Sequence, residues 1–224
     1  MSKFKPQHDD YPPSVASTPR ERERERKDSV RSTTLYSGDP VSKSDKILTL
    51  LGMFEELICY LGIIKAEHFE PATETKFDID SSTKMFLTAR FTQIQETLID
   101  IQASIGTTKK ALARFDFSRF KTGEQRIGEL VQEIGLMSDV DQTQFKVRER
   151  PLMIIPGTLQ IEAQLLYARS LCRKVERQLC TQHDIEDICI SYMNKLSDYL
   201  ITLSIHLLHM KNKEPLRKLT RSNK

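Results

Sequence analysis

The chain has 224 residues, of which 38% are hydrophobic and 29% charged, enough for one sizeable domain plus a tail that stays unfolded in isolation. Its formal net charge of +3 is too small to indicate nucleic-acid binding by itself. With no Trp and only 8 Gly, the composition favours helices over a turn-rich β protein.

The first 32 residues are predicted to form a disordered, charged arm. Pro, Ser and charged residues dominate it, and the run RERERERK at 20–27 alternates in sign without apolar residues. Such a run could contact RNA or an anionic surface. Its glutamates cancel most of the positive field, so a solvated tail is the favoured interpretation. The acidic residues also make the arm a poor mitochondrial presequence.

Helical periodicity predicts two long helices after the arm. The segment KILTLLGMFEELICYLGIIKAEHF at 46–69 carries apolar residues at helical spacing. SSTKMFLTARFTQIQETLIDIQASIG at 81–106 follows, with Ser81 or Ser82 as the expected N-cap. The apolar stripe of this second helix is expected to contain Phe86, Phe91, Ile94, Leu98 and Ile101.

Three more helices are predicted in the second half of the chain. The third is expected to end at Gly135, and Pro156–Gly157 precedes a fourth over about 158–180. A fifth over about 185–210 is apolar on nearly every side. It is therefore expected to be central or to lie at a subunit interface, and the fourth and fifth helices are expected to form that interface.

Strand signals are almost absent, and five helices of this length pack as an antiparallel bundle. The sequence therefore predicts an all-α fold in three parts. A disordered charged arm covers 1–32, a five-helix antiparallel bundle covers 33–211, and a basic tail covers 212–224. Longer loops are expected at about 69–82 and 107–122.

The four cysteines show no CxxC pair and no zinc-ligand spacing with histidine, so buried, reduced thiols and no protein-bound metal are expected. No membrane span is expected, because His206 and His209 interrupt the apolar run near the C-terminus. The N-terminus lacks the apolar core of a secretory signal, so we expect an intracellular protein.

The fourth predicted helix places basic groups close to its apolar face. Arg169, Arg173 and Arg177 recur every four residues, beside Cys172 and Val175 at core-like spacing. On the fifth predicted helix, Asn194, Ser197 and Asp198 share one face.

Together with Glu176, these side chains would form a polar seam between the two helices. Buried charges must be paired or bound to a ligand, and the arginines outnumber the nearby carboxylates. Two interpretations therefore stay open from the residues alone: an anionic ligand, most simply a phosphate chain, or an inter-subunit network of salt bridges.

Three segments resemble the trimeric, ATP-dependent corrinoid adenosyltransferases. They are LYSGDPVSKSDKILTLLGMFEELICYLG at 35–62, IIPGTLQIEAQLLYARSLCRKVER at 154–177 and YMNKLSDYLITL at 192–203. Their order, spacing and intervening lengths agree with that family over about residues 33–211. The similarity implies a homotrimer of five-helix bundles with active sites between neighbouring subunits.

The resemblance also implies the activity. The family transfers the adenosyl group of ATP, held with Mg²⁺, to the cobalt of cob(I)alamin and releases triphosphate. Cob(I)alamin is itself the nucleophile, so the protein has to position the ribose 5′-carbon, neutralise the leaving triphosphate and keep cobalt free of axial ligands. The implied location is the mitochondrial matrix in a eukaryote and otherwise the cytoplasm. A membrane partner is not implied, and nucleic acid is disfavoured.

The resemblance assigns roles to single residues. Arg173 and Arg177 would bind the nucleotide, and Arg169 would pair across the subunit interface with Glu55. The expected catalytic residues are thus Arg173, Arg169 and Glu55. The other expected nucleotide-binding residues are Thr33, Thr34, Lys43, Glu176 and Asn194, supported by Ser197 and Asp198.

The chain departs from the family pattern at two places. The glycine-rich nucleotide loop is replaced by residues 25–32, which contain no glycine. The corrin-facing position, commonly Phe, is Met153, and small residues after Pro156 are replaced by Thr158, Leu159 and Glu162. Two functions therefore remain: an active enzyme, or a catalytically silent relative that binds nucleotide or cobalamin or forms a structural trimer. A nucleic-acid-associated protein that uses the arm is a third alternative.

Overall fold

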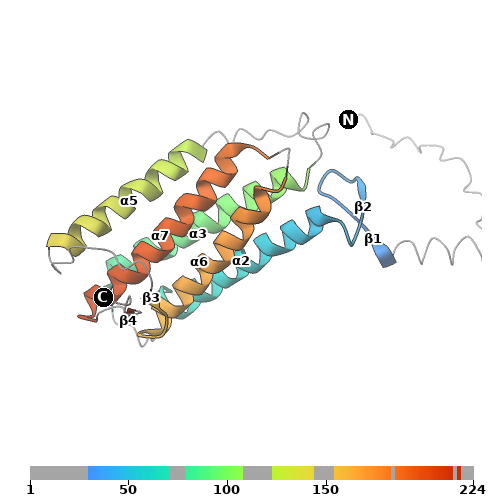
Figure 1. The fold of residues 1–224 in the computed structure, drawn as a ribbon. Helices are drawn as coiled ribbons and strands as arrows, with labels where there is room; N and C mark the ends of the chain where they lie inside the picture. Colours follow the sequence, from blue (N-terminus) through green and yellow to red (C-terminus); the bar gives the residue numbers. More distant parts are fainter. Residues whose placement is uncertain are drawn as a thin grey trace, which may run out of the picture.

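The computed structural model describes residues 30–70, 79–107, 123–143, 154–182, 185–213 and 216–217. Five long helices dominate it: α2 (Lys46–His68), α3 (Ser81–Ile105), α5 (Gly123–Thr143), α6 (Gln160–Leu179) and α7 (Asp187–Met210). They lie side by side, and each runs opposite to the helix before it (Figure 1). The predicted all-α, antiparallel five-helix bundle is confirmed. Most of the predicted arm and tail lie outside the described residues.

Two short antiparallel sheets of two strands each accompany the helices, and the first of them is a hairpin. One pairs β1 (Ser32–Thr34) with β2 (Pro40–Ser42) ahead of α2. The other pairs β3 (Ile154–Ile155), which precedes α6, with β4 (Leu216–Arg217) near the C-terminus. The backbone at 216–217 therefore belongs to the fold, whereas the sequence assigned it to a separate tail.

Helix α2 begins at a side-chain cap, because Asp45 Oδ1 accepts a hydrogen bond of 2.9 Å from the backbone N–H of Ile47. Its core face consists of Leu50, Phe54, Leu57, Leu61 and Ile64, all fully buried. By length and composition alone α2 could cross a membrane, contrary to the sequence-based expectation. The buried stripe accounts for part of this hydropathy, since 28% of the apolar window is buried within the chain.

The N-cap of helix α3 is Asp80, one position before the first of the two serines expected as caps. The Asp80 carboxylate is the N-cap and accepts from the backbone N–H of Thr83 at 2.9 Å. Hydrogen bonds to Ser82 and Thr83 hold the pKa of Asp80 well below its usual range. Phe86 was expected in the core but is 50% exposed, whereas Leu87 is 3% exposed. Leu87 lies four residues before Phe91, so it takes the core position.

Helix α5 does not end at Gly135 as predicted but continues to Thr143. A glycine inside a helix costs about 1 kcal/mol relative to alanine, which is not enough to end a helix that has tertiary contacts beyond it. Such contacts exist here: Met137 packs on the core, and buried Asp141 lies 2.9 Å from His206 Nδ1 of α7.

Helix α7 is the central helix, as its all-round apolar sequence predicted. It packs most extensively on α6 and α5, and most of its residues from Cys189 to His209 are buried within the chain. The surface that was expected to need a partner subunit is therefore already covered by α5 and α6. The sequence-based argument for a subunit interface on this helix therefore loses its main support.

The cysteines divide into two groups. Cys172 and Cys189 are buried, as expected, and burial raises the pKa of Cys189 to about 12. Cys59 and Cys180 are exposed, so the expectation of four buried thiols is wrong for these two. All four are free thiols.

Candidate functional site

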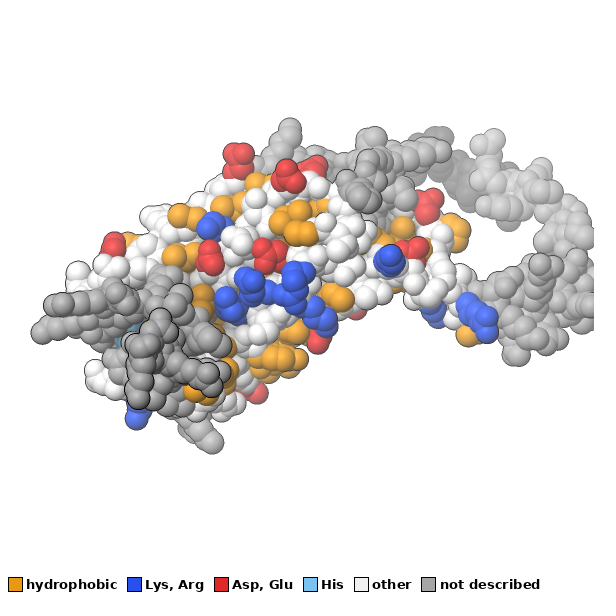
Figure 2. Space-filling view, viewed as in Figure 1, with side chains coloured by type: hydrophobic (Ala, Val, Ile, Leu, Met, Phe, Trp, Pro, Cys, Tyr) orange, Lys and Arg blue, Asp and Glu red, His pale blue; other side chains and the backbone are white. Residues whose placement is uncertain are grey.

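The arginines of α6 lie at the edge of its buried face. The core side of the helix includes Leu165, Leu171 and Val175, which are nearly or fully buried. Arg169 and Arg173 are half-buried beside it, and Arg177 is exposed. Figure 2 shows a group of Lys and Arg side chains in the middle of the visible surface of the bundle, where α6 lies. The predicted cationic stripe is therefore present on one surface of the bundle.

The arginines of the stripe form no ion pair in the described part of the chain. None of the guanidinium groups of Arg169, Arg173 and Arg177 forms an ion pair or a side-chain hydrogen bond there. The Nε of Arg169 is fully buried without an acceptor among the described residues. A buried donor without a partner is costly, so its acceptor is expected from a ligand or from another subunit.

A polar contact between α6 and α7 lies close to the stripe. The Nδ2 of Asn194 donates to Oε1 of Glu176 over 3.0 Å. This bond turns the amide oxygen of Asn194 away from Glu176, where it is available as an acceptor. The structure thus brings together the two residues that the sequence assigned to nucleotide binding on different helices.

The remaining predicted support residues behave differently. Asp198 pairs with Lys195 on its own helix at 3.3 Å, so it does not neutralise the arginines directly. Ser197 is fully buried, and its Oγ has no hydrogen-bond partner among the described residues. Of the polar seam predicted between α6 and α7, the structure therefore shows only the contact between Glu176 and Asn194.

Burial and charge set the pKa of the thiol beneath the stripe. Burial raises the pKa of Cys172 far above its usual range, and Glu176 adds to this, while Arg169 and Arg173 oppose it. The Cys172 Sγ donates to the backbone oxygen of Met193 over 3.1 Å. This thiol is therefore a packing group and not a nucleophile.

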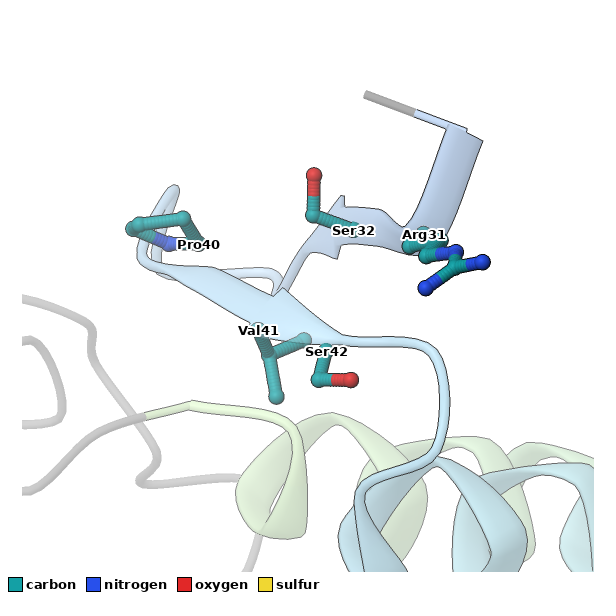
Figure 3. Close-up of a pocket in the computed structure, with 5 residues that line it drawn as sticks. All are labelled: Arg31, Ser32, Pro40, Val41 and Ser42. Atoms are coloured by element: carbon teal, nitrogen blue, oxygen red, sulfur yellow. The ribbon is translucent and has the colours of Figure 1, made fainter. Parts of the chain in front are cut away.

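The hairpin β1–β2 carries the other predicted nucleotide ligands. Arg31, Ser32, Pro40, Val41 and Ser42 line an open hollow of about 310 Å³ on it (Figure 3). Three predicted ligands lie within or beside this hairpin: Thr33, half-buried, and Thr34 and Lys43, both exposed. The Lys43 backbone N–H donates to the Arg31 oxygen over 2.8 Å and closes the hairpin.

Within one chain the hairpin and the stripe are separate. The hairpin lies beyond the end of the bundle at the start of α2, whereas the basic group lies over the middle of α6 (Figures 1 and 2). Glu55 on α2 is exposed and forms no ion pair in the described part of the chain, although its neighbour Glu56 pairs with Lys174 of α6 at 2.9 Å. Among the described residues of the same chain, Glu55 therefore does not pair with Arg169. Met153 lies outside the described residues.

Sequence reasoning noted Glu162 only as a departure from the family pattern. In the structure its side chain is fully buried, and one carboxylate oxygen, Oε2, accepts hydrogen bonds from the backbone N–H groups of Gly157, Thr158 and Leu159. The available signal was an acidic residue in the first turn of a helix that follows a Pro-Gly turn.

Comparisons with known proteins agree with this geometry. A model of the cobalamin adenosyltransferase family matches residues 26–207. The corrinoid adenosyltransferase of Citrobacter freundii is 28% identical over 177 residues, covering 77% of this chain and 87% of that protein. The human corrinoid adenosyltransferase MMAB is 25% identical and is covered over 63% of its length. The chain spans about half, 46%, of the Salmonella typhimurium enzyme PduO.

Solved structures share the fold. A variant of the PduO-type ATP:corrinoid adenosyltransferase from Lactobacillus reuteri, complexed with cobalamin and ATP, matches with a TM-score of 0.69 and 22% identity. The match covers 86% of this chain and 96% of that one. A second variant of the same enzyme matches with a TM-score of 0.68 and 24% identity. The chain belongs to the cobalamin adenosyltransferase family.

Proposed function

We propose that the protein is an ATP:cob(I)alamin adenosyltransferase. In this reaction the electron pair of cob(I) attacks the ribose 5′-carbon of ATP. The Co–C bond forms, the C5′–O bond breaks, and triphosphate leaves with the bonding electrons. The observation that carries the proposal is the arginine stripe on α6, whose guanidinium groups form no ion pair among the described residues and lie at positions where the family similarity expects the nucleotide.

The arginines suit the leaving group. Triphosphate gains negative charge as the C5′–O bond breaks, and preorganised guanidinium groups stabilise that charge most in the transition state. Arg173 is half-buried and Arg177 is exposed, so both charges are accessible from solvent, where a nucleotide can approach α6. The Asn194 amide oxygen, oriented by Glu176, would accept a hydrogen bond from the nucleoside part.

In this proposal the complete site is formed with a second subunit. Thr33, Thr34 and Lys43 lie on a hairpin that is separate from the stripe within one chain, which supports a site shared between chains. We therefore include a homotrimer in the proposal, with Glu55 of a neighbouring copy as the partner of Arg169. The buried, unpaired Nε of Arg169 supports this pairing.

The trimer is tested by its mass. Light scattering at micromolar concentration should give a mass near three chains of 25.9 kDa each. A monomer at all concentrations would contradict the shared site.

The activity is tested by one anaerobic assay. The full chain is mixed with MgATP and chemically reduced cob(I)alamin, and the loss of cob(I) absorbance is followed together with the appearance of adenosylcobalamin. Turnover supports the proposal, and omission of ATP is the control. Tight ATP binding by calorimetry without turnover would instead identify a catalytically silent relative, the alternative that the glycine-free segment at 25–32 favours.

The relatives named above come from bacteria and from human. An intracellular site, the mitochondrial matrix in a eukaryote or the cytoplasm in a bacterium, is part of the same proposal.

A further inference from the structure

The hairpin β1–β2 is attached to the bundle at both of its ends. At its open end β2 leads into α2, and the backbone N–H of Asp45, the N-cap of α2, donates to the Ser42 oxygen over 2.9 Å. At its closed end the backbone N–H of Tyr36 donates to the Gly106 oxygen over 3.1 Å. Gly106 is the C-cap of α3, which ends beside the hairpin turn (Figure 1). Two segments far apart in the sequence therefore meet at this contact.

Gly106 is required by the Tyr36 ring and not by its own backbone. A glycine that ends a helix commonly has a positive φ, but Gly106 has a φ of −77°, which any residue can adopt. A Cβ atom at this position would instead lie 2.8 Å from Cδ2 and 3.4 Å from Cε2 of Tyr36. The optimal separation of two carbon atoms is about 3.5–4.0 Å, so a larger residue would push the ring and its turn away from α3.

This contact sets the direction of the hairpin and adds little to the core. Tyr36 is 65% exposed, so its ring buries little apolar surface. The strands β1 and β2 contact each other more extensively than they contact the helices. If the turn were released from α3, the hairpin would swing about its junction with α2. Thr34, two residues from Tyr36, would move with the turn.

We propose that Tyr36 and Gly106 are positioning residues for ATP, because their contact holds the hairpin in its nucleotide-binding orientation. This inference rests on the proposed function, in which Thr33, Thr34 and Lys43 bind the nucleotide. A hairpin that is docked in advance does not lose conformational freedom when the nucleotide binds. The affinity for ATP therefore depends on the fraction of molecules in which the turn is docked on α3.

The test compares the KM for ATP and the KM for cob(I)alamin in variants of the full chain. Tyr36→Ala removes the ring, and Gly106→Ala forces it aside. Each is expected to lower the docked fraction to about a tenth, which raises the KM for ATP about tenfold, while the KM for cob(I)alamin at saturating ATP changes less than about twofold. Tyr36→Phe retains the ring and should recover the wild-type affinity. Gly128→Ala is the matched control, because an added Cβ on that exposed α5 residue meets nothing within 4 Å.

A double variant tests the contact itself. With Tyr36→Ala present, Gly106→Ala has no ring to displace, and the remaining close neighbour of the added Cβ is the Gln102 oxygen of the same helix at 3.3 Å. The double variant should therefore bind ATP no more than about twofold more weakly than Tyr36→Ala alone. Additive losses, about 100-fold together, would show that the two residues act independently and would overturn the inference.

Hydrogen exchange gives a readout that does not depend on catalysis. The amide of Tyr36, which bonds the Gly106 oxygen, should exchange at least about tenfold faster in Gly106→Ala than in wild type or Gly128→Ala. If wild type neither binds ATP nor transfers an adenosyl group, the proposed function fails and the role toward ATP fails with it. The exchange rate then decides separately whether the contact holds the hairpin. Unchanged exchange in Gly106→Ala would overturn the inference, as would an unchanged KM for ATP or an equal rise of both KM values.

Discussion

Replacing Arg173 with alanine should lower the turnover number about 30- to 1,000-fold, because preorganised charge-assisted contacts contribute roughly 2–4 kcal/mol to the transition state. Arg173 is half-buried and has no ion pair in the described part of the chain, so its charge is available for the departing triphosphate. The melting temperature should change little, because no internal partner is lost. The measurement is single-turnover kinetics with cob(I)alamin and saturating ATP.

Lys174→Ala is the matched control for this variant. It removes a positive charge from the next residue of the same helix, but Lys174 pairs with Glu56 on the surface at 2.9 Å. Such exposed pairs contribute about 0–1 kcal/mol to stability, so the variant should fold normally. Turnover should stay within a few-fold of wild type, because Lys174 is engaged with Glu56. Equal losses of turnover in both variants would mean that Arg173 acts only through the overall positive charge of this surface and not through a specific contact. No loss in Arg173→Ala, together with unchanged ATP affinity, would remove Arg173 from the site.

The largest effect on stability is expected at Arg90 of α3. Its guanidinium bonds Glu133 and, at 2.8 Å, Glu129, both on α5, and the side chains of Arg90 and Glu133 are each only 13% exposed. Arg90→Ala leaves the Glu133 carboxylate buried without its main partner. Breaking such a pair costs about 3–5 kcal/mol, which urea unfolding of the purified variant should detect.

Two controls separate this effect from a general loss of charge. Arg126→Ala removes a more exposed contact, 3.5 Å from the same Glu129, and should cost less than about 1 kcal/mol. Adding Glu133→Gln to Arg90→Ala removes the uncompensated charge and should restore part of the stability. A double variant no more stable than Arg90→Ala would contradict the electrostatic explanation.

The pH dependence has a definite sign. Burial raises the pKa of Glu133, and Arg90 is the main group that opposes this shift. In Arg90→Ala the folded-state pKa of Glu133 should therefore lie further above its unfolded value. The folded state then binds the proton more tightly than the unfolded state. The loss of unfolding free energy in Arg90→Ala is therefore full at pH values above the folded-state pKa of Glu133, and it shrinks as the pH falls through that pKa.

Some details of the helices were not predictable from local patterns. Leu87 replaced Phe86 in the core because the orientation of α3 against α2 decides which of two adjacent apolar residues faces inward. Gly135 did not end α5 because Met137 and Asp141 make tertiary contacts beyond it. In both cases packing, worth several kcal/mol, outweighs a local preference of about 1 kcal/mol.

The sequence by itself determined the class of fold, the five helices and the arginine stripe, because helical periodicity and i, i+4 spacing are local properties of the chain. The family resemblance added the expected roles. Only the tertiary structure decided which polar groups meet across helices: Asn194 with Glu176, and Arg90 with Glu133. These contacts depend on the orientation of helices and turns relative to one another. That orientation is set by the packing of the whole core, which no local pattern encodes.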